Sequence, residues 1–137
     1  MEGAVRDDNE TEARGGSDAR EPITAVRAAR LNEIRGYILD NLRQHGLSIH
    51  AVANRHGISV SYVRQLFAAE GTTFSEFVLQ QRLSAADAML RDPHFADRSI
   101  TAIAFEAGFG DAGYFNRIFR RRFGKKPAEA RIALRKD

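Results

Sequence analysis

Cysteine is absent from the 137-residue sequence. Disulfide bonds, thiolate metal sites and cysteine nucleophiles are therefore all excluded. The four histidines lack the spacing of a metal site such as HExxH, and the sequence contains no glycine-rich nucleotide loop and no nucleophile elbow. These absences predict a protein that has no metal and no cofactor and that is not an enzyme.

Long apolar runs are absent as well. No stretch approaches the roughly 18 apolar residues that a membrane span requires. The sequence also does not open on the charged, apolar and small-residue pattern of a signal peptide. We therefore expect a cytoplasmic protein without a membrane partner, and the length allows one domain, or one domain and a tail.

Charge is distributed unevenly, although the net charge is only +3. Residues 1–26 carry three basic and seven acidic side chains and show no apolar period, which predicts a disordered acidic arm. Residues 111–137 carry nine basic and three acidic side chains. A basic end of this kind favours a polyanion partner such as nucleic acid, because phosphate neutralisation releases counterions. From charge alone, however, a basic surface that is merely exposed to solvent is a better interpretation than a nucleic-acid partner.

Residues 99–124, SITAIAFEAGFGDAGYFNRIFRRRFG, form the most informative stretch. Ser99 is suited to cap a first helix, since its hydroxyl can accept from the free N–H groups of the first turn. Gly108 would end that helix in a left-handed conformation. Asp111 has the chemistry to cap a second helix that runs to about Phe123. The spacing predicts a helix-turn-helix.

The second of these helices has two contrasting sides. Phe115, Ile118 and Phe119 recur at the i, i+3 and i+4 spacing of a buried stripe. The opposite side carries small, amide and arginine side chains at positions 112, 113, 116, 117 and 120. A helix that reads the major groove requires this combination of an apolar inner stripe and a polar outer side.

An earlier stretch, residues 48–70, repeats this pattern. Ser48 is placed to cap a helix, Gly57 to end it, and Ser59 to cap a second helix. The inner stripe of that second helix is Val63, Leu66 and Phe67. The two copies are offset by 51 residues at the turn and by 52 in the second helix, which indicates an internal duplication.

Three further helices complete the predicted fold. Residues 27–44 show a helical apolar spacing. Residues 73–91 begin with a capping-box pattern and form a long helix between the two copies. Pro127 sits where a last helix would begin. The sequence therefore predicts an all-α fold of about seven helices, with two helix-turn-helix subdomains joined by a long central helix, in a domain of residues 27–137.

Two segments carry a family resemblance: LSIHAVANRHGISVSYVRQLFAAEGTTFSEFVLQQRL and the more diagnostic SITAIAFEAGFGDAGYFNRIFRRRFGKKPAEAR. Over residues 31–134 the sequence resembles the DNA-binding domain of the AraC/XylS family of bacterial transcription regulators. The resemblance implies a two-lobed fold whose recognition helices enter successive major-groove segments of double-stranded DNA. One chain would then read an asymmetric site as a monomer, and would be nucleoid-associated when bound.

The resemblance also implies which side chains touch DNA. The implied base contacts are Ser61, Arg64, Gln65, Gly113, Tyr114, Asn116 and Arg117. Phosphate contacts position a protein on the duplex but do not specify its base sequence. The predicted phosphate contacts are Arg82, Arg120, Arg121, Lys125 and Lys126. For Arg82 a hydrogen bond between the lobes is an equal alternative, and for Tyr114 partly buried packing is the alternative.

Three positions depart from the family pattern. Gly113 has no side chain where a polar one is common. The second helix-turn-helix would therefore distinguish fewer base pairs or rely on DNA shape. Lys126 and Ala130 would weaken the cap and the packing of the last helix.

Family members often carry an effector-binding domain, for which the 26 residues ahead of Arg27 are too few. We therefore expect a chain with no effector-binding domain, either a short stand-alone member or a fragment.

Three functions remain open from the sequence. The leading hypothesis is a sequence-specific DNA-binding transcription regulator, an activator that also touches RNA polymerase. The alternative is a truncated paralogue that acts as a protein-interaction module on RNA polymerase or another regulator, which Gly113 and the acidic arm favour slightly. The third is an alkyl-transfer repair enzyme with a similar domain, but the absent cysteine removes the acceptor nucleophile that this chemistry needs.

Overall fold

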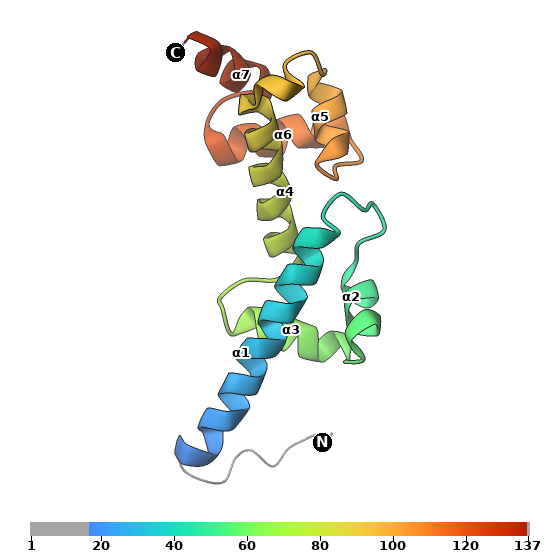
Figure 1. Cartoon of the computed structure of the whole chain (residues 1–137), viewed down its shortest axis with the longest axis vertical. Coiled ribbons are helices and arrows are strands. Elements are labelled where there is room, and N and C mark those ends of the chain that lie inside the picture. Colours follow the sequence, from blue (N-terminus) through green and yellow to red (C-terminus); the bar gives the residue numbers. More distant parts are fainter. Residues whose placement is uncertain (1–16, 137) are drawn as a thin grey trace. The chain divides into compact units, whose positions relative to one another are not determined.

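The computed structural model describes the backbone of residues 17–136 and the side chains of residues 24–131. Within this range all regular secondary structure is helical (Figure 1). The helices are α1 (Ser17–Asp40), α2 (Ile49–His56), α3 (Val60–Ala68), α4 (Phe74–Arg91), α5 (Ile100–Glu106), α6 (Ala112–Phe123) and α7 (Pro127–Lys136), with a 3₁₀ turn, η2 (Pro93–Phe95), after α4. None of the described helices is long and apolar enough to cross a membrane. The predicted all-α fold of about seven helices is confirmed.

The chain falls into two compact units. The first ends at Arg35 and the second is Gly36–Asp137, so α1 contributes residues to both. In the first unit Leu31 and Ile34 of α1 are buried. The second unit contains both helix-turn-helix segments and the helix that joins them.

α1 differs from its prediction at both ends. It begins at Ser17, ten residues before its predicted start. Residues 1–16 of the predicted disordered arm lie outside the described range, and the disorder of the arm stays a prediction. α1 also stops at Asp40, four residues before its predicted end. Just beyond it, the backbone N–H and the side chain of Asn41 both donate to the Tyr37 carbonyl, at 3.1 and 2.8 Å.

The first helix-turn-helix consists of α2 and α3. Ser48 caps α2 and Ser59 caps α3, each through a hydroxyl oxygen that accepts from a first-turn N–H at 3.0 Å. Gly57 ends α2 in the left-handed conformation, with φ of +66°. The predicted inner stripe of α3 is buried. The caps, the turn and the stripe are therefore confirmed.

The second helix-turn-helix consists of α5 and α6. Ser99 caps α5 and Asp111 caps α6, again with a first-turn N–H donating to the side-chain oxygen at 3.0 Å. Phe115 and Phe119 of α6 are fully buried, with ring centroids 5.5 Å apart. These contacts confirm the caps and the aromatic stripe that the sequence predicts.

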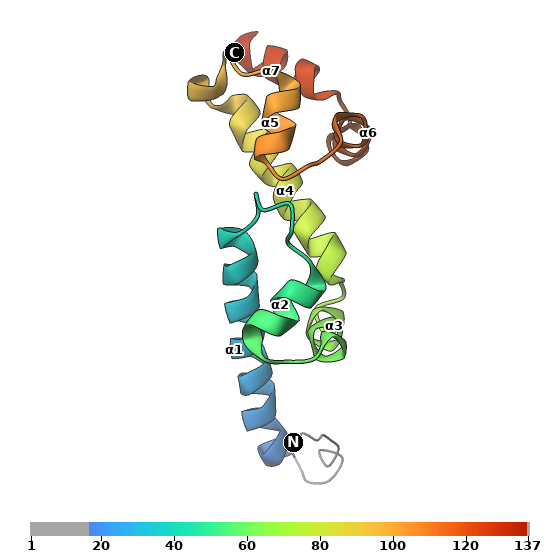
Figure 2. The ribbon, with the colours of Figure 1, turned by 90° about the vertical axis from the view of Figure 1, so that its right-hand side faces the viewer.

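α4 joins the two helix-turn-helix segments and is apolar on two sides. The Thr73 hydroxyl caps it by accepting from the Glu76 N–H at 3.0 Å. Its first half packs on α3, where the rings of Phe74 and Phe67 meet edge to face with centroids 6.1 Å apart. Its second half shares a core with α5 and α6 through Leu83, Ala86, Met89 and Leu90. Figure 2 shows α4 running from one helix-turn-helix to the other.

α7 closes the second helix-turn-helix. Pro127 begins the helix, as predicted, and is fully buried. The Lys126 backbone N–H donates to Glu129 Oε1 at 2.8 Å, which is one half of a capping box. Ala130 packs against the core of this half. Glu129 therefore compensates for the side-chain cap that the sequence expects Lys126 to lack.

Candidate nucleic-acid interface

α3 presents a polar outer side because its apolar stripe is buried. Val63, Leu66 and Phe67 point into the core, so the helical spacing turns the positions between them outward. The predicted base contacts of this helix, Ser61, Arg64 and Gln65, are all exposed. Arg64 forms no ion pair with any carboxylate in the described part of the chain.

α6 presents the corresponding side of the second copy. Gly113, Asn116 and Arg117 are exposed. The Asn116 Nδ2 donates to the Ala112 carbonyl at 2.9 Å, which holds this amide against the helix backbone. A Cβ built on Gly113 would lie 3.5 Å from Arg117 Nη1. The Arg117 guanidinium therefore lies over the first turn of α6, in van der Waals range of the position that glycine leaves without a side chain.

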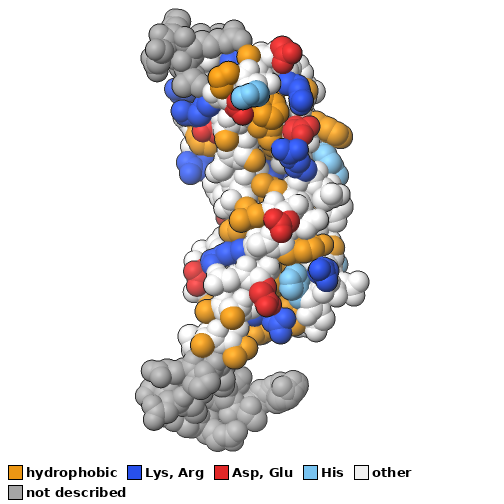
Figure 3. Space-filling model, viewed as in Figure 1, with side chains coloured by type: hydrophobic (Ala, Val, Ile, Leu, Met, Phe, Trp, Pro, Cys, Tyr) orange, Lys and Arg blue, Asp and Glu red, His pale blue; other side chains and the backbone are white. Residues whose placement is uncertain are grey.

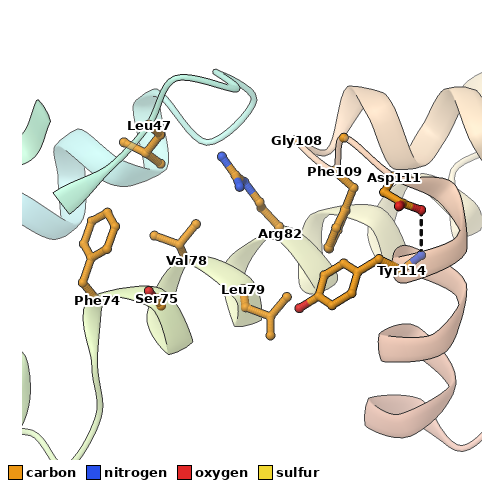
Figure 4. Close-up of a pocket in the computed structure, with 11 residues that line it drawn as sticks. Leu47, Phe74, Ser75, Val78, Leu79, Arg82, Gly108, Phe109, Asp111 and Tyr114 are labelled. Carbon is orange, nitrogen blue, oxygen red and sulfur yellow. Dashed lines mark hydrogen bonds between the residues drawn. The ribbon is translucent and has the colours of Figure 1, made fainter. Parts of the chain in front are cut away.

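Tyr114 lies partly on the surface and partly in a pocket. It is 41% exposed, and its ring centroid is 6.3 Å from that of Phe109. Figure 4 shows the side chain pointing from α6 toward Leu79 of α4, at the edge of an open pocket of about 370 Å³. The partly buried packing that the sequence offered as the alternative for Tyr114 is therefore present. Its contact with a DNA base stays a prediction.

Four of the predicted phosphate contacts are exposed cations near the end of α6. Arg120, Arg121, Lys125 and Lys126 form no ion pair with a carboxylate among the residues that the structure describes. In Figure 3, Lys and Arg side chains show at the edge where α6 ends and α7 begins. Phosphate oxygens are suitable partners for such a group of cations.

Arg82 is the exception among the predicted phosphate contacts, because it is part-buried. Its Nε donates to the Leu42 carbonyl and its Nη2 to the Gln44 carbonyl, both at 3.0 Å. Burial lowers the pKa of the guanidinium, which nevertheless stays protonated at neutral pH. For Arg82 the sequence left two alternatives, a phosphate contact or a hydrogen bond within the protein. The structure contains hydrogen bonds of the second kind.

Sequence reasoning missed a second set of contacts around the same loop. Arg43 Nη1 lies 2.7 Å from Glu106 Oε2, and the rings of His45 and Phe105 stack with centroids 4.5 Å apart. The Arg43–Glu106 pair is separated by 63 residues in sequence. No local spacing pattern signals a contact of this range.

Arg122 also has a role that the sequence did not indicate. Its Nε donates to Gln80 Oε1 at 2.8 Å, and its guanidinium lies 5.2 Å from the ring centroid of Phe123. The hydrogen bond to Gln80 ties α6 to α4. Arg122 is therefore held by a protein partner, although its side chain is exposed like those of the neighbouring arginines.

Histidines and carboxylates take part in structural contacts. His56 Nδ1 lies 2.9 Å from the Val52 carbonyl oxygen, and His94 Nδ1 lies 2.9 Å from Asp92 Oδ1. Hydrogen bonds from the backbone N–H and the side chain of His94 lower the pKa of the Asp92 carboxyl. Within the described range, no three His, Asp or Glu side chains come close enough to share a metal ion.

Comparison with known sequences places this architecture in a family. A family of helix-turn-helix domains matches residues 52–132. The chain is 39% identical to the transcriptional activator RhrA of Rhizobium meliloti (strain 1021) over 102 residues, which are 74% of this chain and 32% of that protein. It is 36% identical over 104 residues, 75% of this chain and 36% of the relative, to the HTH-type transcriptional activator RhaS of Escherichia fergusonii. The chain thus spans about a third of the length of these curated relatives.

Solved structures share the fold. A probable AraC family transcriptional regulator from Rhodopseudomonas palustris CGA009 superposes with a TM-score of 0.68 at 27% identity, covering 77% of this chain and 97% of that chain. The C-terminal domain of AraT, a response regulator from Geobacillus stearothermophilus, has the same fold with a TM-score of 0.68 at 24% identity, over 76% of this chain and 84% of that chain. From its two capped helix-turn-helix units, its joining helix and these matches, the chain belongs to the AraC/XylS family of helix-turn-helix transcription regulators.

Proposed function

We propose that this protein is a sequence-specific, double-stranded DNA-binding transcription regulator that reads two successive major-groove segments with α3 and α6. One observation carries the proposal: both helices begin at a side-chain cap, bury an apolar stripe and expose a polar outer side. Recognition helices of helix-turn-helix proteins insert such a side into the major groove. Membership of a family of transcription regulators supports the same function.

The two helices offer different side chains to the bases. With the 52-residue offset between the copies, Arg64 corresponds to Asn116 and Gln65 to Arg117. Arginine pairs bidentately with guanine, and glutamine or asparagine with adenine, each contributing about 1–3 kcal/mol of discrimination. We therefore expect an asymmetric site whose two halves differ in sequence.

We further propose that a single bound chain activates transcription. The relatives named above are described as transcriptional activators, and an activator would also touch RNA polymerase. Because one chain carries both reading helices, a monomer is sufficient to occupy the site. Light scattering of the complex with a duplex should give one chain per site, and two chains would contradict the monomer.

Selection of bound duplexes from a random library tests the function as a whole. The expected result is a site of about 20 base pairs, since two adjacent turns of the major groove span that length. Enrichment of no sequence would instead favour a protein-interaction module, for which the missing side chain at Gly113 is the supporting observation.

Arg117→Ala tests the role of α6. The variant should lose preference at one or two neighbouring base pairs in one half of the selected site, with a cost of about 1–3 kcal/mol on the wild-type sequence. Repeating the selection with the variant measures this change directly.

Lys125→Ala is the matched control for Arg117→Ala. It removes an exposed cation that is predicted to touch phosphate, so it should weaken binding to all sequences alike and leave the selected site unchanged. If Arg117→Ala also leaves the selected site unchanged, α6 does not read bases and the assignment fails.

A further inference from the structure

The loop between α1 and α2 meets both α4 and the second helix-turn-helix at one place. We define the first lobe as α2 and α3, the second lobe as α5, α6 and α7, and the junction as the contacts of loop residues 42–45 with Arg82, Gly108 and α5. All of these residues belong to the second compact unit. The junction is a second connection between the lobes besides the continuous helix α4.

Arg82 forms the centre of the junction. Its two hydrogen bonds, from Nε to the Leu42 carbonyl and from Nη2 to the Gln44 carbonyl, are both 3.0 Å long. The guanidinium is a planar fork with fixed donor directions, and hydrogen bonds from a charged donor are stronger than neutral ones. The loop that leads into the first lobe is therefore held in one position relative to the middle of α4.

Gly108 brings the second lobe to the same point. It has φ of +108°, and a Cβ built there would lie 2.5 Å from Arg82 Nε and 2.6 Å from the Leu42 carbonyl oxygen. Contacts this short exclude any side chain at this position. The turn before α6 is thus packed directly on the Arg82 guanidinium and on the carbonyl that it binds.

Three contacts at the surface surround this centre. Glu106 of α5 lies 2.7 Å from Arg43 and 3.9 Å from Arg98. The ring of Phe105 stacks on His45 with centroids 4.5 Å apart, although Phe105 is 62% exposed. Exposed ion pairs add little stability, so these contacts orient the loop more than they stabilise the fold.

A second connection matters because DNA has a fixed helical repeat. Inserting one base pair moves the next major-groove segment by about 3.4 Å and rotates it by about 35°. Two lobes joined by one helix alone could bend or twist to follow such a change, whereas a junction that fixes one lobe against the other resists it.

We propose that the junction, with Arg82 as its positioning residue, fixes the separation and rotational phase of α3 and α6, and so makes the protein selective for the number of base pairs between its two half-sites. This inference rests on the proposed DNA-binding function. Arg82 acts through the loop and the turn, and touches no base in this mechanism.

The test compares spacing penalties in the full chain. Duplexes carry the selected site with none, one or two base pairs inserted between the half-sites. Wild type should lose at least about tenfold in affinity on a one-base-pair insertion. Arg82→Met keeps the apolar stem and removes the donors, and should lose less than about threefold on the same insertion.

Arg91→Met is the matched control, because Arg91 lies on the same helix and pairs with Asp87 away from the junction. It should keep the wild-type spacing penalty. Arg82→Lys keeps a positive charge and a donor, and should give an intermediate penalty. If thermal unfolding shows that Arg82→Met does not fold, Arg82→Lys decides the question.

Two failures are distinguishable. If wild type binds no sequence selectively, the proposed function fails and the junction inference falls with it. If wild type binds selectively but the folded Arg82 variants show the wild-type spacing penalty, the junction inference is overturned while the DNA-binding function stands.

Discussion

Asp92 lies between α4 and η2 and uses its backbone for the first and its carboxylate for the second. It ends α4 with extended backbone and caps η2, where its Oδ1 accepts from the His94 N–H at 2.9 Å. The His94 ring adds a contact from Nδ1 at 2.9 Å. These hydrogen bonds favour the charged carboxylate and lower its pKa in the folded state.

A pH dependence of stability follows from this shift. Because the folded pKa lies below the unfolded one, the contribution of Asp92 is fully present above the ordinary carboxyl range and is lost as the pH falls through the folded pKa. Asp92→Asn keeps an acceptor for the cap but cannot titrate. The free energy of unfolding of wild type minus that of Asp92→Asn should therefore decrease below about pH 4. A difference that stays constant down to pH 2 would count against the assigned contacts.

At the scale of single residues, the local contacts could be predicted and the distant ones could not. Ser48, Ser59 and Ser99 cap helices as the sequence predicts, because a cap depends on a spacing of three residues. Arg82 bonds to carbonyls 38 and 40 residues away. An arginine in a helix carries no local sign of such a partner, so the sequence left phosphate and protein contacts as equal alternatives.

At the scale of elements, α6 depends on its cap. Asp111 Oδ1 accepts from the Tyr114 N–H at 3.0 Å, at the turn whose residues are predicted to enter the major groove. Asp111→Ala should destabilise the protein by about 1 kcal/mol. Urea unfolding measures this loss. Asp111→Asn is the control, since it keeps an acceptor and should change stability much less.

Helices whose ends are marked by a local residue signal begin and end as predicted. The ends of α1 differ from their prediction. α2 and α6 end at glycines with φ of +66° and +79°, a backbone region that favours glycine. α1 has no such signal at either end. Apolar spacing alone fixes no boundary, and α1 runs from Ser17 to Asp40 where the spacing predicts residues 27–44.

At the scale of the whole molecule, affinity should depend steeply on salt. The predicted phosphate contacts Arg120, Arg121, Lys125 and Lys126 are exposed. Neutralising about four phosphates gives a slope of about −4 in a plot of log K against log salt concentration. Fluorescence anisotropy over a salt series measures the slope. A slope near zero would show that these cations do not meet phosphates.

The apolar surface of α4 is divided between two cores, and this limits how the protein can be recombined. Phe74 contributes to the packing beside α3, whereas Leu83 and Leu90 belong to the core around α6. A chimera that took one reading unit from a relative would place foreign side chains against half of this helix. Under the proposed function, new sequence preferences are therefore best obtained by exchanging outward-facing residues of α3 and α6 one at a time. Transplanting a whole half would require a joining helix redesigned to match it.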